Sequence, residues 1–344
     1  MSTETILVTG GAGYIGSHTL VALTEMTDYA VISADNYSNS SAETYNRIAK
    51  ITGKVIPHIE ADLSDPKQVE KIFRDHPEIS GVIHFAAYKS VPESVSKPEL
   101  YYHNNINSLL NILASGKKNN LRKIIFSSSC SVYGNIDSLP VNEQTPFGQT
   151  ESPYAFTKIV GENIMKDTIA VSENLRGISL RYFNPVGAHP SGSMGELPNQ
   201  RPNNLVPVIT QTAIGKIKSM QVFGDDYPTR DGTCIRDYIH VCDIAEAHVM
   251  ALNLLDTPGQ PAYDIYNLGT GTGITVLEAI HAFEKVSGQK LSFEIVSRRA
   301  GDVAAIYSDS SKALSQLGWK TKRSLDEMMS TAWKWEQHLA AQKV

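Results

Sequence analysis

Residues 8–18 read VTGGAGYIGSH, and this stretch decides the fold. A short apolar run over 6–9 precedes it, and a helix-compatible segment over 17–27 follows it. In a strand–turn–helix of this kind, Gly10 permits the tight turn, Gly13 lets a pyrophosphate approach the backbone, and Gly16 lets helix and strand pack closely. The phosphates would then lie at the positive end of the helix dipole. The pattern predicts a dinucleotide-binding turn, although a glycine turn without a ligand is the alternative.

An acidic residue at the end of the second apolar run favours NAD over NADP. Asp35 follows the run 31–33 and lies 19 residues beyond Gly16. Its carboxylate is placed to accept hydrogen bonds from the adenosine ribose diol, and its charge should repel a 2′-phosphate. A glycine pattern alone is weak evidence, but the spacing between Gly16 and Asp35 makes the prediction of an NAD site specific.

Short apolar runs alternate with helix-compatible segments through the first half of the chain. The runs cover 6–9, 31–33, 55–59, 82–85, 123–126 and 178–180, and the helical segments cover 17–27, 66–75, 101–119 and 154–173. Nearly continuous β-branched runs are typical of strands buried on both faces of a parallel sheet. The alternation predicts an α/β fold with a Rossmann-type, doubly wound parallel sheet. Ligands should bind beyond the carboxyl ends of its strands.

The composition changes after Asn184, where 185–204 is rich in proline, glycine and asparagine. We expect a domain boundary there, with an NAD-binding domain over 1–184 and a smaller α+β substrate domain over 185–344. A length of 344 residues agrees with two domains. The segment near 237–262 is expected to return to the first domain, and the last helix should cover 324–339.

Composition excludes several classes of function. The net charge of −5 gives no support to binding of nucleic acid or anionic membranes. The three cysteines are odd in number and lack CxxC spacing, which argues against disulfides and a structural zinc site, and the histidines show no metal-ligand spacing. We therefore expect no metal and a reducing, cytoplasmic compartment. No signal peptide and no apolar stretch long enough to span a membrane is expected.

A tyrosine and a lysine are spaced for catalysis within the segment 154–173. Tyr154 and Lys158 would lie one turn apart on one helix face. A tyrosine with a pKa near 10 needs a drop of about 3 units, or roughly 4 kcal/mol, to act as a base at neutral pH. One cation about 4 Å away supplies about that much at an effective dielectric near 20. Lys158 and an oxidised nicotinamide ring are two such cations, so we expect them to outweigh burial.

Ser129 follows the fifth apolar run and can bond the same substrate hydroxyl as Tyr154. A Ser/Tyr/Lys set beside a nicotinamide removes a proton from an alcohol while hydride leaves the carbon.

These residues and several longer motifs resemble the extended short-chain dehydrogenase/reductase family, and within it the UDP-hexose 4-epimerases. The resemblance covers essentially the whole chain. Besides the glycine turn, it rests on VIHFAAYKSVPESV at 82–95, IFSSSCSVYG at 125–134, SPYAFTK at 152–158, LRYFNPVGAH at 180–189, PNNLVP at 202–207, FGDDYPTRDGTCIRDYIHV at 223–241, YNLGTG at 266–271 and RRAGD at 298–302.

The resemblance implies roles for individual positions. Tyr154 is the expected general base, Lys158 its activator and a ligand of the nicotinamide ribose, and Ser129 the hydroxyl partner. The implied NAD contacts are Gly10, Gly13, Tyr14, Ile15, Gly16, Asp35, Asn36, Asn39, Ser40, Asp62, Leu63, Phe85, Ala86, Ala87, Lys89, Asn104, Ser129, Tyr154, Lys158 and Phe183. The implied UDP-sugar contacts are Ser129, Tyr154, Asn184, Asn204, Leu205, Gln221, Val222, Phe223, Arg236, Arg299, Asp302 and Ile306.

The implied activity is reversible epimerisation at C4 of a UDP-hexose, UDP-galactose to UDP-glucose, through a transient 4-keto sugar with NAD as a recycled hydride acceptor. Arg236 and Arg299 would offer donor forks to the diphosphate, unless they form ordinary surface ion pairs. Several family members carry an aromatic residue where this chain has Ile306, with Tyr307 beside it. Isoleucine is smaller, so we expect some activity on UDP-GlcNAc or UDP-GalNAc.

Two alternatives and one partner complete the expectations. A nucleotide-sugar 4,6-dehydratase needs an Asp-Glu pair after the serine, but Cys130 and Ser131 follow Ser129. A non-catalytic NAD-sensing regulatory protein need not keep the Ser129, Tyr154 and Lys158 set. A homodimer is expected through 101–119 and 154–173, the helices through which the family often pairs, unless these helices pack only within the monomer.

Overall fold

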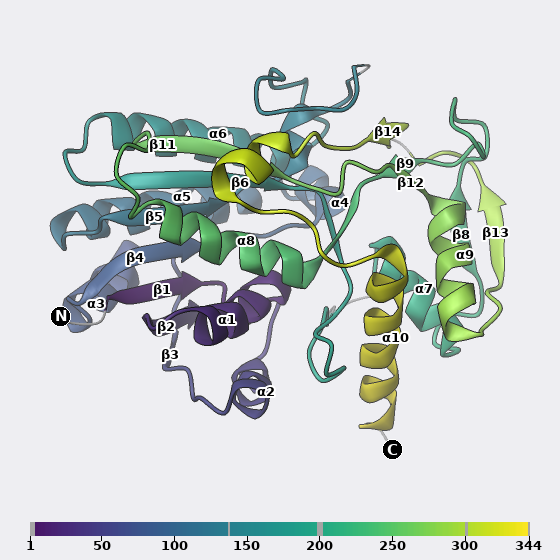
Figure 1. The fold of residues 1–344 in the computed structure, drawn as a ribbon, viewed down its shortest axis with the longest axis horizontal. Coiled ribbons are helices and arrows are strands. Elements are labelled where there is room, and N and C mark those ends of the chain that lie inside the picture. The colour runs from purple at the N-terminus through teal and green to yellow at the C-terminus, as the bar shows by residue number, and fades with distance from the viewer. Residues whose placement is uncertain (1–3, 137, 198–201, 300–301, 343–344) are drawn as a thin grey trace.

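The computed structural model describes residues 4–136, 138–197, 202–299 and 302–342. A large sheet with helices on both faces forms one part of the molecule, and a smaller part of short strands and helices lies beyond one edge of this sheet (Figure 1). This is the edge at which the parallel strands of the large sheet have their carboxyl ends.

The large sheet has seven strands, all parallel, in the order β11-β6-β5-β4-β1-β2-β3. This arrangement confirms the predicted α/β, doubly wound fold. The strands are β1 (Thr5–Thr9), β2 (Ala30–Asp35), β3 (His58–Glu60), β4 (Ile79–His84), β5 (Lys123–Ser127), β6 (Arg176–Tyr182) and β11 (Tyr263–Leu268).

The order of the strands reverses between β1 and β4, which are neighbours in the sheet. Leu7 of β1 pairs with Ile32 of β2 on one side and with Val82 of β4 on the other. A doubly wound sheet opens a crevice at such a point, outside the carboxyl ends of its strands. The loops after β1, β2, β4, β5 and β6 therefore converge on one edge, where the smaller part lies.

Helices cover both faces of the sheet (Figure 1). On one face α1 (Tyr14–Met26) packs against α8 (Val241–Leu254) and α2 (Glu43–Thr52). On the other face α5 (Pro98–Lys118) lies between α3 (Pro66–Asp75) and α6 (Pro153–Ala170), with the short α4 (Val91–Ser96) beside it. Each face has its own apolar core, centred on residues such as Leu20 and Ile244 on one side and Leu109 and Met165 on the other.

One local prediction about an element was wrong, and one helix was not named from the sequence. The third strand begins three residues later than the expected 55, because only residues 58–60 pair with β2. Helix α2 was not among the helical segments named from the sequence. It is short and mostly polar, and only Thr44, Tyr45 and Ile48 are buried, so its apolar signal is weak.

The smaller part contains three short sheets and three helices. Its sheets pair β7 (Asn184–Val186) with β10 (Tyr238–His240), β8 (Met220–Phe223) with β13 (Phe293–Val296), and β9 (Ile235–Arg236) with both β12 (Ile274–Thr275) and β14 (Ala305–Ile306). The helices are α7 (Leu205–Ala213), α9 (Val276–Ser287) and α10 (Leu325–Ala341). Their apolar faces enclose a separate core that includes Val206, Ile280 and Met329.

The chain crosses between the two parts more than once. After β10 it runs into α8, which lies against α1, and then into β11, which extends the large sheet beside β6. These residues come from the second half of the sequence, and β11 lies beyond the segment 237–262 that was expected to return.

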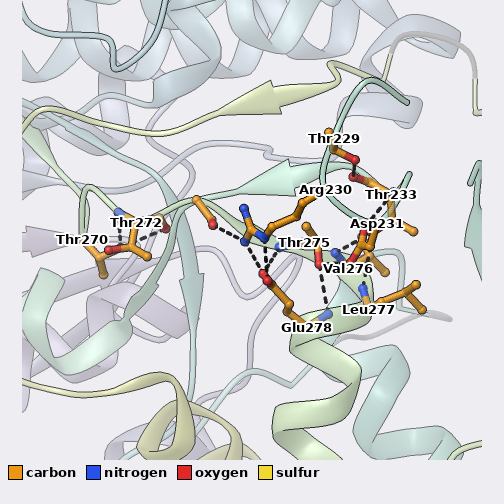
Figure 2. A network of polar contacts seen from close by, with 11 residues as sticks. Thr229, Arg230, Asp231, Thr233, Thr270, Thr272, Thr275, Val276, Leu277 and Glu278 are labelled. Atoms are coloured by element: carbon orange, nitrogen blue, oxygen red, sulfur yellow. Dashed lines mark hydrogen bonds and ion pairs between the residues drawn. The ribbon is translucent and has the colours of Figure 1, made fainter. Parts of the chain in front are cut away.

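A polar network fixes the loop between β8 and β9 to the start of α9 (Figure 2). The Arg230 guanidinium pairs with the carboxylate of Glu278, which also caps α9 together with Thr275. The Asp231 carboxylate accepts hydrogen bonds from Thr233 and Thr275. Because this loop joins the strand of Phe223 to the strand of Arg236, the network holds two predicted substrate contacts in register.

Within the described ranges, the three cysteines are unpaired and no cluster of three or more His, Cys, Asp or Glu side chains could hold a metal ion. The same residues contain no helix with the length and apolar character needed to cross a membrane.

Candidate active site

The glycine turn forms a cradle of bare backbone between β1 and α1. Gly10 has a φ of +70°, and a Cβ there would lie 2.8 Å from the amide nitrogen of Ala86. A Cβ on Gly16 would collide with the carbonyl oxygen of Gly10. Gly13 caps α1 without a side chain, and the first turn of the helix carries no acidic residue. The cradle therefore has the shape and the positive helix end that a dinucleotide pyrophosphate needs.

We expect Gly16→Ala to weaken NAD binding at least about tenfold, because the added methyl group forces the turn open. Calorimetry or measurement of retained NAD after gel filtration would show the loss. Gly53→Ala is a matched control, since Gly53 ends α2 with open space around it. Its φ of +71° makes the change costly for stability, but NAD binding should stay unchanged. Wild-type NAD affinity in Gly16→Ala would contradict this interpretation.

Asp35 lies at the end of β2 beside the cradle. Its Oδ2 accepts a hydrogen bond from Ala12 N at 3.0 Å, and its Oδ1 accepts from Tyr37 N at 2.9 Å and Ser40 Oγ at 2.8 Å. The carboxylate is thus fixed in place by the turn itself and by the predicted contact Ser40. An ionised carboxylate has about four acceptor positions, so one remains for a ribose hydroxyl.

The other predicted NAD contacts lie in the loops that follow the strands. Tyr14 and Ile15 open α1, Asn36 and Asn39 follow β2, Asp62 and Leu63 follow β3, Phe85, Ala86, Ala87 and Lys89 follow β4, Asn104 lies on α5, and Phe183 follows β6. The strand ends bring these residues to one edge of the sheet. Phe85 is held by the ring of His248, with the two centroids 4.6 Å apart.

The predicted catalytic residues meet at the same edge. Ser129 follows β5 and caps a short 3-10 helix (Cys130–Tyr133), and Tyr154 and Lys158 lie in the first turns of α6. The Lys158 ammonium is buried, 5.7 Å from the centre of the Tyr154 ring, and donates to Ser127 O at 2.7 Å. All three side chains therefore lie within one small region between β5 and α6.

Burial dominates the electrostatics of Tyr154 among the chain's own groups. Burial raises the pKa of Tyr154 above its usual value, neighbouring Tyr182 adds to the rise, and a hydrogen bond with Ser129 opposes it. Burial also lowers the pKa of Lys158 to about 8, against the effect of Glu162. Among the chain's own groups burial dominates, so Lys158 alone does not lower the pKa of Tyr154. The prediction also counted the positive charge of an oxidised nicotinamide, and for the two cations together it stays a prediction.

Two arginines and one carboxylate gather on the smaller part. Arg299 Nη2 lies 2.9 Å from Asp302 Oδ1, and Arg236 Nη2 lies 3.6 Å from the same oxygen. The Arg299 guanidinium also covers the ring of Phe223 on β8 at 5.3 Å from its centre. The prediction considered simple surface ion pairs as the alternative. Here two guanidinium groups share one carboxylate, so the cluster keeps a net positive charge suited to a diphosphate.

Asp237 is a site residue that sequence reasoning missed. It is fully buried, and its carboxylate accepts five hydrogen bonds, from Thr270 N and Oγ1, Gly271 N, and Ser308 N and Oγ. Its carbonyl oxygen also accepts from Asn184 N at 2.9 Å. Asp237 therefore ties together the segments that carry Asn184, Arg236 and Ile306. Only its place next to Arg236 could have suggested this role.

Glu196 is a second residue that was missed. Its Oε1 accepts from Lys89 Nζ at 2.8 Å and from Asn204 Nδ2 at 3.0 Å. Lys89 was predicted to contact NAD and Asn204 the sugar nucleotide, so one carboxylate joins the two sets. Leu205 follows Asn204 at the start of α7, and Gln221 and Val222 precede Phe223 on β8.

Ile306 lies on β14, opposite Arg236 on β9. Its side chain is buried in a small apolar cluster with Phe183, Ile159 and Val132, and Cys130 packs against this cluster. Ile306 is therefore close both to a predicted NAD contact and to the residue that follows Ser129.

Comparisons with known proteins agree with this geometry. Residues 6–269 match the model of the NAD dependent epimerase/dehydratase family. The UDP-glucose 4-epimerase of Bacillus subtilis is 50% identical over 332 residues, covering 96% of each chain.

Two solved structures are also similar over nearly their whole lengths. The UDP-glucose 4-epimerase of Stenotrophomonas maltophila, with bound NAD and formylated UDP-arabinopyranose, has a TM-score of 0.94 and 44% identity, covering 98% of this chain and 99% of that one. The enzyme of Bifidobacterium longum, in complex with NAD+ and UDP, has a TM-score of 0.92 and 46% identity, covering 97% and 98%.

Proposed function

The chain belongs to the NAD dependent epimerase/dehydratase family, and from this premise we propose that it catalyses the reversible epimerisation of a UDP-hexose at C4, with NAD as its cofactor. UDP-galactose and UDP-glucose are the substrate pair, because relatives about half identical to the chain carry that activity in their names. The observation that carries the proposal is the meeting of Ser129, Tyr154 and Lys158 at the sheet edge that also holds the glycine cradle.

Each residue of the site has its own role in the proposed reaction. Tyr154 takes the proton of the sugar 4-hydroxyl and later returns it, and Ser129 holds the same hydroxyl. Lys158 stabilises the phenolate and binds the nicotinamide ribose. Bound NAD supplies the hydride acceptor and donor. Arg236 and Arg299 hold the diphosphate while the 4-keto sugar turns, so that both faces of C4 can react.

The direct test is to mix the protein with UDP-galactose and follow UDP-glucose. Conversion without net consumption of NAD is the expected result. No conversion, with bound NAD verified, would favour the NAD-sensing alternative. Formation of a 4-keto-6-deoxy sugar would favour the dehydratase, although Cys130 and Ser131 stand where that chemistry uses an acidic pair.

We propose that the pocket also accepts UDP-GlcNAc and UDP-GalNAc, because Ile306 is smaller than an aromatic residue. Ile306→Tyr should lower turnover of UDP-GlcNAc about tenfold or more and that of UDP-galactose by less than about threefold, since the larger ring takes the space of the acetamido group. Ile306→Val is the control for disturbed packing. Turnover confined to the non-acetylated pair in the wild type would contradict the proposal.

We further propose that the protein is a homodimer formed through α5 and α6. Leu100, Tyr102 and Leu110 on α5 and Phe156 on α6 are exposed apolar side chains, and the rings of Tyr102 and Phe156 lie 6.2 Å apart. Such a group on one face is typical of an association surface. Sedimentation of the NAD-loaded protein at the mass of one chain would contradict this.

We also propose two domains. An NAD-binding domain covers 1–184 together with α8 and β11, and a sugar-binding domain covers the rest of 185–344.

The three free cysteines favour a cytoplasmic location, which cell fractionation would test.

A further inference from the structure

A buried carboxylate lies directly behind the catalytic residues. Glu162 is on α6, one turn beyond Lys158, and its side chain is 2% exposed. Its Oε1 accepts hydrogen bonds from Ser128 Oγ at 2.5 Å and Arg181 Nε at 2.9 Å, and its Oε2 accepts from Arg181 Nη2 at 2.6 Å. The Arg181 side chain is equally buried, at 3%. One carboxylate thus joins three elements.

Each of these three elements carries part of the site. Ser128 follows β5 and precedes Ser129, and Arg181 lies on β6, two residues before Phe183. A buried ion pair is weak evidence for stability, because apolar residues of similar volume often stabilise a core as well or better. The fork of Arg181 instead gives a defined geometry, since both of its bonds to the carboxylate must form together.

We propose that Glu162 is a positioning residue for the Ser129, Tyr154 and Lys158 set, acting through its bonds to Ser128 and Arg181 and through its place one turn beyond Lys158. This inference rests on the proposed function. The bonds hold the end of β5, the face of α6 and the end of β6 together. The charge of Glu162 favours the protonated form of the Lys158 amine, which is the form that Tyr154 needs.

The surroundings of Lys158 explain why this charge matters. Burial lowers the pKa of Lys158 to about 8, and the Glu162 carboxylate acts against that effect. His84 on β4 is also buried, and its pKa is lowered to about 3, so its ring is neutral near pH 7 and adds no charge. Two groups act on Glu162 from neighbouring strands, Arg181 on β6 and Tyr263 on β11. The groups that act on Tyr154 are Tyr182, Cys130 and Tyr101. Without the carboxylate, Lys158 would lose its proton nearer to neutral pH.

Glu162→Gln tests both the positioning bonds of the carboxylate and the effect of its charge on Lys158. We expect kcat for UDP-galactose to fall about tenfold or more, with KM changed less than about threefold, because the substrate contacts remain. The alkaline limb of the kcat profile should move to lower pH by about one unit. Glu162→Asp keeps the charge but shortens the reach, so it should restore the limb while kcat stays low.

Glu143→Gln is the matched control, since Glu143 belongs to the same polar chain at its far end. Its Oε1 accepts from Asn267 N at 2.7 Å, Asn267 Oδ1 accepts from Tyr133 OH, and Tyr133 OH accepts from Arg181. The substitution is chemically identical but leaves the Glu162 carboxylate and its bonds to Ser128 and Arg181 in place, so the alkaline limb should not move. An equal shift in Glu143→Gln and Glu162→Gln would overturn the proposal, because any loss in the network would then suffice.

A titration separates this inference from the proposed function. Lysine labelled with ¹³C at the ε-carbon, with the Lys158 signal assigned by its loss in Lys158→Met, reports the protonation of the amine in a protein that need not turn over. The midpoint should lie near 8 in the wild type and lower in Glu162→Gln. A folded Glu162→Gln with wild-type midpoint and kcat would overturn the proposal, whereas an inactive wild type would overturn only the epimerase function.

Should Glu162→Gln fail to fold, Ser128→Ala decides the matter. It removes one bond to the carboxylate and leaves the ion pair in place. We expect kcat to fall several-fold without a change in KM. The alkaline limb should stay in place, because the carboxylate remains, and wild-type kcat in this variant would overturn the proposal.

Discussion

Tyr154→Phe is expected to lower kcat for UDP-galactose by about a hundredfold to ten-thousandfold, the range of general acid–base catalysis. The phenyl ring fills the same buried space, so the fold and the NAD site should persist, while the oxygen that takes the 4-hydroxyl proton is gone. KM should change less than about threefold, because the diphosphate contacts are untouched. A coupled assay for UDP-glucose measures both constants.

The matched control is Tyr263→Phe. Tyr263 lies on β11, and its hydroxyl shares a hydrogen bond of 2.8 Å with Ser179 Oγ. This variant loses one buried hydroxyl at a distance from the reacting atoms, so it should keep most of the activity. Retention of more than about a tenth of kcat in Tyr154→Phe would show that another group moves the proton.

The large sheet and its functional edge could be predicted from the sequence because both depend on local patterns. Each apolar run ends in residues of a distinct type, such as Asp35 or Ser129, and a parallel sheet brings all strand ends to one edge. No contact between distant segments had to be known. The YxxxK spacing likewise depends only on the helical repeat.

Other features could not be predicted because they depend on partners far apart in the sequence. Asp237 accepts its bonds from residues 270, 271 and 308, and Glu162 meets an arginine 19 positions away. β11 looks like any short strand, and only its pairing with β6 places it in the large sheet. The sequence also does not show how deeply Tyr154 and Lys158 are buried, and burial raises the pKa of Tyr154 among the chain's own groups.

The buried histidines give the second large expectation, a steep loss of stability in mild acid. Burial lowers the pKa values of His18, His84 and His240 to about 3 and that of His248 to about 4. The Nε2 atoms of His18 and His248 have no hydrogen-bond partner among the described residues, so a proton there would be left without an acceptor.

The sign follows from proton uptake. Each folded-state pKa is below the ordinary value of 6.5, so below that pH the unfolded chain binds protons that the folded chain does not, and the free energy of unfolding falls. At pH 5.5 each histidine costs about 1.4 kcal/mol, or about 6 kcal/mol for the four together. That is comparable to the whole stability of a typical domain, roughly 5–15 kcal/mol. We therefore expect unfolding to begin between pH 6 and pH 5, well above the folded-state values.

Urea unfolding at pH 7.5, 6.5 and 5.5 would measure this dependence, and His248→Phe would assign part of it. The His248 ring packs against Phe85 and Tyr182. Among the described residues its Nδ1 bonds only to Ile244 O of its own helix, so an apolar ring can replace it. The variant should lose about a quarter of the change in unfolding free energy between pH 6.5 and 5.5. His281→Gln, on the exposed side of α9, is the matched control and should leave the dependence unchanged. A free energy of unfolding that stays constant from pH 7.5 to 5.5 would mean that these histidines gain protons within the folded protein.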